Sequence, residues 1–164
     1  MKAYKAEDLR ALTQALFLTD MFDGFLLSEA EFRTFCTFTV DGRTDRGWYT
    51  DEELEEQRVE ELASYGRLRP LCFSLIKGKR TPGFFRIVLK LSPEGTEELL
   101  KENRPDLSPE SAGFYMNFRF EEGTLTCVTA ASMNVFPPDR ALEEAWDRKV
   151  PELFRERGIA VSEL

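Results

Sequence analysis

The sequence predicts an α+β fold: a largely antiparallel sheet of about five strands, with helices packed on one face. Segments of alternating apolar and polar residues follow one another through short turns, and strands connected in this way pair antiparallel. Between them lie segments whose apolar residues recur three and four positions apart, as in helices that cover a sheet with one side. The predicted order is helix, strand, helix, two strands, helix, two strands, helix.

The first half of the chain contains two predicted helices and one strand. Leucines at helical spacing predict a helix over residues 6–18, and residues 29–40 alternate as one strand before an Asp-Gly turn. The pattern TDEE is typical of a capping box and begins a helix over residues 50–64. Trp48 and Tyr49 immediately precede this helix. An aromatic pair at such a place usually packs back onto the core, and the alternative is stacking on a ligand.

The middle of the chain predicts a hairpin and a third helix. Residues 69–77 and 84–91 are rich in apolar residues and predict two strands joined through residues 78–83. Ser92 followed by Pro93 is typical of a helix start, because serine caps the first turn and proline suits its first position. We expect this helix to end near residue 103.

The last third of the chain contains the clearest alternation. Ser-Pro-Glu at residues 108–110 predicts a short turn, and residues 113–136 predict a hairpin around Glu-Gly. After a break at residues 137–138, Asp139 can cap a C-terminal helix with one apolar side. Pro151 should kink this helix or restart it.

Length and composition predict one globular domain. The chain has 164 residues with 42% hydrophobic and 32% charged content, enough for one core, and we find no repeat or long linker. We therefore expect a single domain over residues 1–164. The apolar runs are only a few residues long and the N-terminal residues carry charges of both signs, so we expect neither a membrane span nor a signal peptide.

Three features restrict the chemistry. The chain has no histidine, which excludes Ser-His-Asp and Cys-His machinery and histidine metal ligation. Cys36, Cys72 and Cys127 lie in predicted strands without a CxxC motif, so we expect buried thiols and a reducing, cytoplasmic compartment. The net charge of −8 repels polyanions, so any anion binding would have to be local. We predict no cofactor, no metal site and no catalytic residue.

Three stretches of the sequence resemble those of a known family: FDGFLLSEAEFRTFCTFTVDGR at 22–43, RPLCFSLIKGKRTP at 69–82, and GTLTCVTAASMNVF with EEAWD within 123–147. The family consists of small, uncharacterised proteins from clostridia-like bacteria and is catalogued as a domain of unknown function. The resemblance extends over nearly the whole chain, which implies a single domain. It implies no activity, ligand or catalytic residue.

Positive charge is concentrated in one segment. Between Leu62 and Pro93 there is no acidic residue, whereas the preceding stretch 51–62 carries seven acids and one arginine. The segment holds seven basic residues, which leaves 15 of the 22 basic residues against all 30 acidic residues elsewhere. Such asymmetry is informative about binding partners. The seven basic residues are Arg67, Arg69, Lys77, Lys79, Arg80, Arg86 and Lys90.

The loop KGKRT at residues 77–81 offers cations, backbone amides and a hydroxyl, a combination that binds anions through charge-assisted hydrogen bonds. It lacks a Walker sequence. In the alternative interpretation, the acidic helix over residues 51–62 lies beside this loop and neutralises it through surface ion pairs. Lysines also guard edge strands against aggregation.

The alternation also predicts which side chains share the sheet face that points away from the helices. This face would be net positive and rich in aromatic and hydroxyl groups, a composition that binds single-stranded nucleic acid or nucleotides and also occurs in protein interfaces. An error of one residue in the register of 84–91 would turn two of its cations to the other face. The predicted face comprises Arg33, Phe35, Thr37, Thr39, Arg86, Lys90, Tyr115, Asn117, Arg119, Ser132 and Asn134.

We therefore expect a non-catalytic binding or interaction module that contacts an anionic small molecule, a nucleotide or an acidic protein surface. Two alternatives stay open. One is a small enzyme that uses carboxylates or lysines as acid and base in a cleft near the same cations, and the other is a homodimer with the open sheet face as its interface. A deep pocket with a cation beside a buried carboxylate would favour the enzyme. The predicted binding residues are Lys77, Lys79, Arg80, Arg86, Lys90, Arg119 and Arg33.

Overall fold

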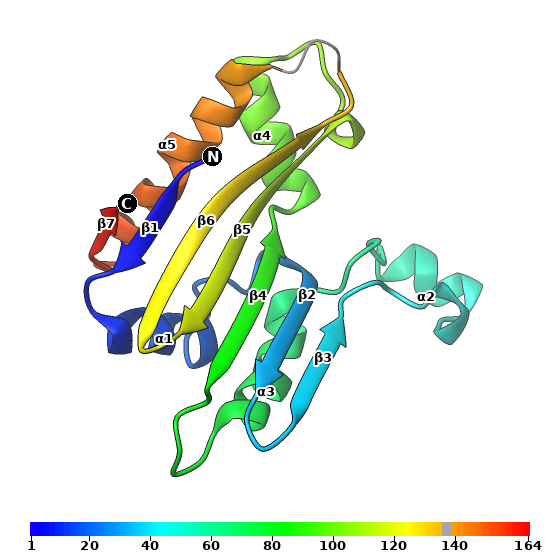
Figure 1. Cartoon of the computed structure of the whole chain (residues 1–164). Helices are drawn as coiled ribbons and strands as arrows, with labels where there is room; N and C mark the ends of the chain where they lie inside the picture. The colour runs from blue at the N-terminus through cyan, green and yellow to red at the C-terminus, as the bar shows by residue number, and fades with distance from the viewer. Residues whose placement is uncertain (136–138) are drawn as a thin grey trace.

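The computed structural model describes residues 1–135 and 139–164, and this part of the chain has an α+β architecture with a seven-stranded antiparallel sheet (Figure 1). The sheet order is β3-β2-β4-β5-β6-β1-β7. About five strands were predicted, and β1 and β7 escaped prediction because segments of four and three residues are too short to show a period. The strands are β1 Ala3–Ala6, β2 Leu26–Arg33, β3 Thr37–Asp41, β4 Phe84–Lys90, β5 Ala112–Glu121, β6 Thr124–Met133 and β7 Val161–Glu163.

Four helices cover one face of the sheet and leave the other face open within the described residues (Figure 1). The core between sheet and helices contains many phenylalanines, and the rings of Phe85 and Phe120 stack at 5.3 Å. In the described ranges, no helix is both long enough and apolar enough to cross a membrane. The covering helices are α1 Leu9–Phe17, α3 Tyr65–Ile76, α4 Pro93–Asn103 and α5 Arg140–Glu156, while α2 Asp51–Glu56 projects away from the sheet.

Helix starts agree with their predicted caps. Thr50 forms the complete capping box with Glu53, Ser92 accepts a hydrogen bond in the first turn of α4, and Asp139 caps α5. The Ser-Pro-Glu turn is a short 3₁₀ helix, Pro109–Ser111, and the predicted hairpin forms β5 and β6. Helix α5 continues through Pro151 without a restart. The predicted break at residues 137–138 and the last residue of the hairpin range, 136, lie outside the described residues.

The predicted strand over residues 69–77 is wrong, because these residues form most of α3. A short apolar run fits a buried strand and a buried helix equally well, so only its packing decides between them. Here the run packs as a helix: Cys72 is fully buried and Leu68, Leu75 and Ile76 pack against the core. Consequently the basic segment contains one strand, β4, and no hairpin.

The predicted strand over residues 29–40 is a hairpin of β2 and β3. Residue 33 pairs with 37 and residue 29 with 41, so odd-numbered residues of both strands lie on the same face. One uninterrupted alternation therefore runs through both strands and the turn, and it resembles a single strand. The predicted helix over residues 50–64 ends already at Glu56, and Arg58 has a left-handed backbone conformation with φ of 47°. No residue of α2 is buried, so packing does not extend this acidic helix.

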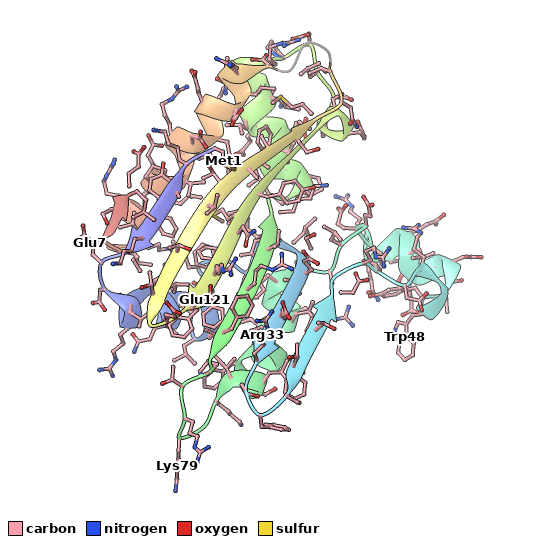
Figure 2. The ribbon with its side chains drawn as sticks, in the orientation of Figure 1. Met1, Glu7, Arg33, Trp48, Lys79 and Glu121 are labelled. Carbon is pink, nitrogen blue, oxygen red and sulfur yellow. The ribbon has the colours of Figure 1, made fainter. Side chains whose placement is uncertain are left out.

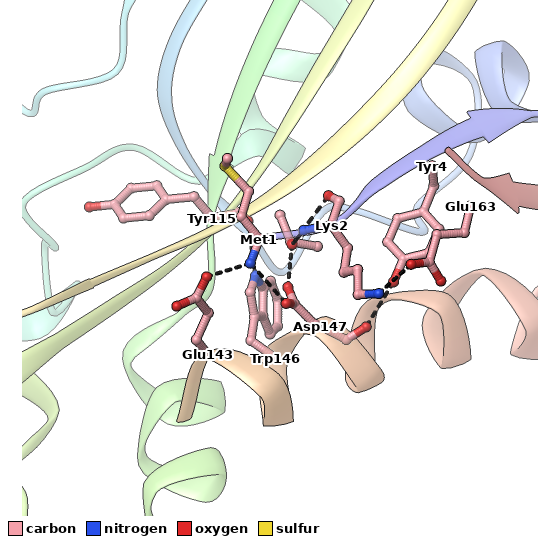
Figure 3. Close-up of polar contacts among 9 residues, drawn as sticks. Met1, Lys2, Tyr4, Tyr115, Glu143, Trp146, Asp147 and Glu163 are labelled. Carbon is pink, nitrogen blue, oxygen red and sulfur yellow. Dashed lines mark hydrogen bonds and ion pairs between the residues drawn. The ribbon is translucent and has the colours of Figure 1, made fainter. Parts of the chain in front are cut away.

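Strand β1 is held onto α5 by a polar network (Figure 3). The hydroxyl of Tyr4 donates to the Asp147 carbonyl at 2.9 Å, and the buried hydroxyl of Thr129 donates to the Asp147 carboxylate. The Lys2 backbone N–H donates to the Thr129 hydroxyl at 2.8 Å. The indole N–H of Trp146 donates to the Tyr115 carbonyl at 2.9 Å, which fixes α5 to the middle of the sheet. These bonds rigidify the half of the sheet that lies away from β3.

Candidate anion and partner site

Arg33, Arg86, Lys90 and Arg119 all lie on the open face of the sheet. The alternate residues of β4, among them Ile87 and Leu89, are fully buried against the helices, so Arg86 and Lys90 point to the other side. In the register of the sheet, Arg86 stands opposite Arg119, and Lys90 stands opposite Tyr115. The register error that the alternation left open did not occur.

Carboxylates pair with three of these four cations, so the expected net positive face is a face of mixed charge. Glu29 accepts from Arg86 at 2.8 Å, Glu31 from Arg33 at 3.2 Å, and Glu121 from Arg119 at 2.8 Å. The alternation contained this signal, because residues 29, 31 and 33 share one parity, as do residues 119 and 121. An anion that binds there must compete with carboxylates already in place.

Aromatic rings also hold these cations in position. The guanidinium carbon of Arg33 lies 4.2 Å from the centre of the Phe84 ring, and that of Arg119 lies 5.3 Å from the same ring. The Lys90 ammonium lies 5.9 Å from the centre of the Tyr115 ring. Contacts of this kind contribute about 0.5–1 kcal/mol at exposed sites. They fix the cations against the sheet and reduce their reach toward a partner.

A groove of about 580 Å³ lies on the open face, across β2, β3 and β4. It brings Arg86 and Lys90 together with Glu29, Glu31 and the Tyr115 ring. The side chain of Glu29 is 54% exposed and that of its partner Arg86 is 31% exposed, so the pair lies in contact with solvent. This is the region in which the small-enzyme alternative would place its acid and base.

Lys77, Lys79 and Arg80 lie in the loop that joins α3 to β4, at one end of the molecule. All three are exposed, and Lys79 points away from the sheet at the loop tip, distant from Arg33 and Glu121 in Figure 2. Among residues 1–135 and 139–164, no carboxylate forms an ion pair with any of the three. Their charge is therefore available to a partner, unlike that of the three arginines on the sheet face.

A pocket of about 470 Å³ lies between this loop and the turn of the β2–β3 hairpin; we name it the basic pocket. One side carries the three cations, and the other is apolar. Phe35 is 91% exposed and meets the Phe38 ring edge-on at 5.7 Å. An anionic group next to an apolar one fits this combination. The pocket is lined by Thr34, Phe35, Phe38, Ser74, Leu75, Ile76, Lys77, Gly78, Lys79, Arg80, Thr81 and Gly83.

The acidic residues 51–61 do not neutralise the basic loop. None of their carboxylates takes part in an ion pair of the described chain, and the segment projects from the opposite end of β3 (Figures 1 and 2). The expectation that Trp48 packs onto the core is also wrong, since its side chain is 79% exposed. Within the described residues, the acidic segment and the basic loop are thus both unpaired and lie at separate places.

The cysteines lie in three different environments. Cys72 and Cys127 are fully buried as expected, although Cys72 is helical, and burial raises the pKa of the Cys72 thiol to about 11. Burial likewise raises the pKa of Cys127. Cys36, predicted to be buried, is exposed in the hairpin turn. In the part of the chain that the structure describes, no three cysteine or carboxylate side chains are placed to hold a metal ion.

Comparison with known proteins gives one match. A model described as a family of unknown function, DUF5721, matches residues 15–162, which include both the basic pocket and the open sheet face. Neither a curated protein nor a solved structure matches the chain. The expected resemblance to an uncharacterised family is confirmed, and the bacterial group to which it was assigned stays a prediction.

Proposed function

Because the chain belongs to a family of unknown function, DUF5721, we infer its role from its own residues: we propose that it is a non-catalytic binding module. Its basic pocket, together with the adjoining sheet face, contacts an anionic ligand or an acidic protein surface. The backbone N–H of Gly83, at the end of the loop, donates to the Arg33 carbonyl at 3.1 Å, so the pocket and the face are contiguous.

The observation that carries this proposal is the contrast between the two groups of cations. Lys77, Lys79 and Arg80 are exposed without a carboxylate partner among the described residues, whereas Arg33 and Arg119 are already paired. An approaching carboxylate or phosphate gains charge-assisted hydrogen bonds at the loop without displacing an internal acid. The phenylalanines beside the loop supply apolar contact area, as in protein interfaces.

The experiment that tests the proposal is an anisotropy titration with three fluorescent probes: a nucleotide, a single-stranded oligonucleotide and a glutamate-rich peptide. We expect at least one probe to bind at about 50 mM salt and to weaken at about 300 mM, because released counterions favour binding at low salt. The double variant Lys79→Glu, Arg80→Glu should abolish this binding.

The matched control carries the same charge change at a remote place. Arg148 and Arg155 are exposed on α5, and their replacement by Glu alters the net charge equally but leaves the pocket intact. If the control variant weakens binding as much as the loop variant does, only the overall charge of the protein matters. Absence of binding for all three probes at low salt, at a protein concentration at which the chain is monomeric, would also refute the proposal.

The small-enzyme alternative rests on the groove that holds Arg86 and Lys90. It would require a carboxylate that is shielded from water beside a cation, and Glu31, with a side chain that is 21% exposed, is the nearest approach to this in the groove. Turnover of any substrate that is lost in Glu31→Gln and retained in Lys79→Glu would favour the enzyme. The third alternative, a homodimer through the open face, would bury Tyr115 and Lys90.

A further inference from the structure

Strand β3 is one edge of the sheet, and its outer side is unpaired in the described residues. The hydrogen bonds at its two ends, from Gly42 N–H to the Ser28 carbonyl and from Thr34 N–H to the Cys36 carbonyl, are both 3.0 Å long. In an antiparallel pair, every second residue directs its N–H and C=O groups toward the neighbouring strand, and the residues between direct theirs away from the sheet. The backbone N–H and C=O groups of Thr37, Thr39 and Asp41 therefore point outward from the edge.

This edge is short and ends in the charged Asp41, but it carries no other common protection against a further strand. The sequence TFTVD contains no lysine and no proline, and four of its five residues are β-branched or aromatic. The side chains of Thr37, Thr39 and Asp41 are exposed, while Phe38 and Val40 pack against the core. A strand of this kind is a template for pairing with a further strand.

The acidic arm, which we define as residues 44–61, emerges next to this edge. It is closed at its base by the hydrogen bond from Thr44 N–H to the Glu61 carbonyl, 2.9 Å long, and it contains α2, which buries none of its side chains. In Figure 1 the arm extends laterally beyond β3, and in Figure 2 Trp48 projects from it. An exposed tryptophan is typical of a contact surface, and Trp48 lies next to the seven acids of residues 51–61.

We propose that two copies of the chain pair through their β3 edges about a two-fold axis, and that each lays its acidic arm on the basic pocket of the other. The inference rests on the proposed function and names a second copy as the acidic partner. Its geometric basis is the order of the chain. The turn 34–36 of the basic pocket precedes β3, and the arm follows it after Gly42. Antiparallel pairing of two β3 strands therefore brings the arm base of one copy beside the pocket of the other.

The outward groups specify the register. Thr39 lies on the two-fold axis opposite its own copy, and Thr37 stands opposite Asp41 of the second copy, which yields about six backbone hydrogen bonds. No like charges are opposed in this register, and threonine pairs are favourable across strands. The interface is isologous and closes on itself, so it leads to dimers and does not propagate into fibres.

The two surfaces also complement each other chemically. The arm carries eight carboxylates against two arginines, and the loop carries three cations without described partners, so the contact gains electrostatic attraction. Trp48 supplies an apolar ring, and the pocket offers Phe35 with 91% of its surface exposed. Both exposed aromatic side chains would lose contact with water in the same interface.

The experiment measures oligomeric state by sedimentation velocity between about 1 and 100 µM chain. We expect the wild type to dimerise. The loop variant Lys79→Glu, Arg80→Glu and the arm variant Glu55→Lys, Glu56→Lys should each weaken dimerisation on the order of 100-fold, because each opposes like charges at both symmetric contacts. Lysines at the end of α2 suit its dipole, so the arm variant should keep its fold.

Mixing the two variants is the decisive test. In the mixed pair the lysines introduced at the end of α2 meet the glutamates introduced into the loop, and the unchanged acidic arm meets the unchanged basic loop. The mixture should therefore form a heterodimer, although each variant alone dimerises only weakly. Thr39→Pro should block pairing as well, since it removes an outward N–H without removing a bond to β2. Its control, Thr39→Val, keeps this N–H and should dimerise.

A wild type that stays monomeric at about 100 µM overturns the inference, as does a dimer that survives both Thr39→Pro and the charge reversals. The inference is also wrong if the charge reversals do not weaken the dimer, or if the two reversed variants do not form a heterodimer when mixed. Failure of this inference is distinguishable from failure of the proposed function. If the wild type is monomeric but binds an anionic probe through Lys79 and Arg80, the binding module stands and its partner is another molecule.

Discussion

Gly42 offers the sharpest test of how the acidic arm is joined to the sheet. A β-carbon at this position would lie 1.7 Å from the carbonyl oxygen of Leu27 and 2.6 Å from its carbonyl carbon. Because both atoms belong to the backbone, no side-chain rotation can relieve the overlap. A β-carbon does not approach a non-bonded atom within 3.0 Å, so Gly42→Ala must displace one backbone by about 1.3 Å in a closely packed region.

This displacement affects three hydrogen bonds at the arm base. Gly42 N–H donates to Ser28 at 3.0 Å, Ala63 N–H donates to Gly42 at 2.8 Å, and Leu27 N–H donates to Ala63 at 2.8 Å. Each contributes about 0.5–1.5 kcal/mol, and overpacking alone costs typically 1–3 kcal/mol. We therefore expect Gly42→Ala to lower the free energy of unfolding by about 3 kcal/mol.

The assay is urea denaturation followed by circular dichroism, and the matched control is Gly24→Ala. A β-carbon at Gly24 meets no atom within 4 Å, and this glycine is exposed, so its replacement should change the free energy of unfolding by less than about 1 kcal/mol. If Gly42→Ala were as stable as Gly24→Ala, the close approach of residues 27 and 42 would be incorrect, and with it the attachment of the arm.

Three further outcomes follow from single contacts. The Tyr65 hydroxyl donates to the Leu16 carbonyl at 2.6 Å in the core, so Tyr65→Phe should cost about 1–2 kcal/mol in urea unfolding because the carbonyl is left unpaired; an unchanged midpoint would contradict this. Cys36 alone should react with a thiol reagent in the native protein, and three thiols should react in denaturant; rapid native labelling of a second thiol would contradict the burial of the other two. The hydrogen bond from Arg104 holds the pKa of Asp139 below its ordinary value, so this group stabilises the fold fully above the unfolded pKa of about 3.9 and loses its contribution as the pH falls through the lower folded pKa. The difference in stability between wild type and Asp139→Asn should therefore be constant above pH about 5 and decrease as the pH falls through the folded pKa, and a difference independent of pH would contradict the ion pair.

The parts of the fold that could be predicted are those that depend on neighbours in sequence. Ser92 and Asp139 cap their helices through hydrogen bonds to residues two or three positions away, and this chemistry is visible in a short stretch. The alternation of residues 113–136 likewise predicted β5 and β6 because both faces of a hairpin are encoded in a period of two.

The candidate site was predictable only in part. The exposure of Lys77, Lys79 and Arg80 follows from their charge, and the position of Arg86 and Lys90 on the open face follows from the alternation of β4. The pairing of Arg33 with Glu31 and of Arg119 with Glu121 could also have been predicted, because residues two apart in a strand lie on the same face. By contrast, no local pattern places the hairpin turn beside the loop after α3, since these segments are about 40 residues apart in the chain.

By itself, then, the sequence determined the α+β class, the caps of its helices, the alternation of its strands and the segregation of its charges, because each of these depends on interactions between near neighbours. Only the tertiary structure decided that residues 69–76 are helical, that β1 and β7 complete the sheet, and that acidic arm and basic pocket lie at opposite ends of an open edge strand. The physical reason is burial: an apolar run such as that around Cys72 has no preferred structure until distant segments supply the surface on which it packs.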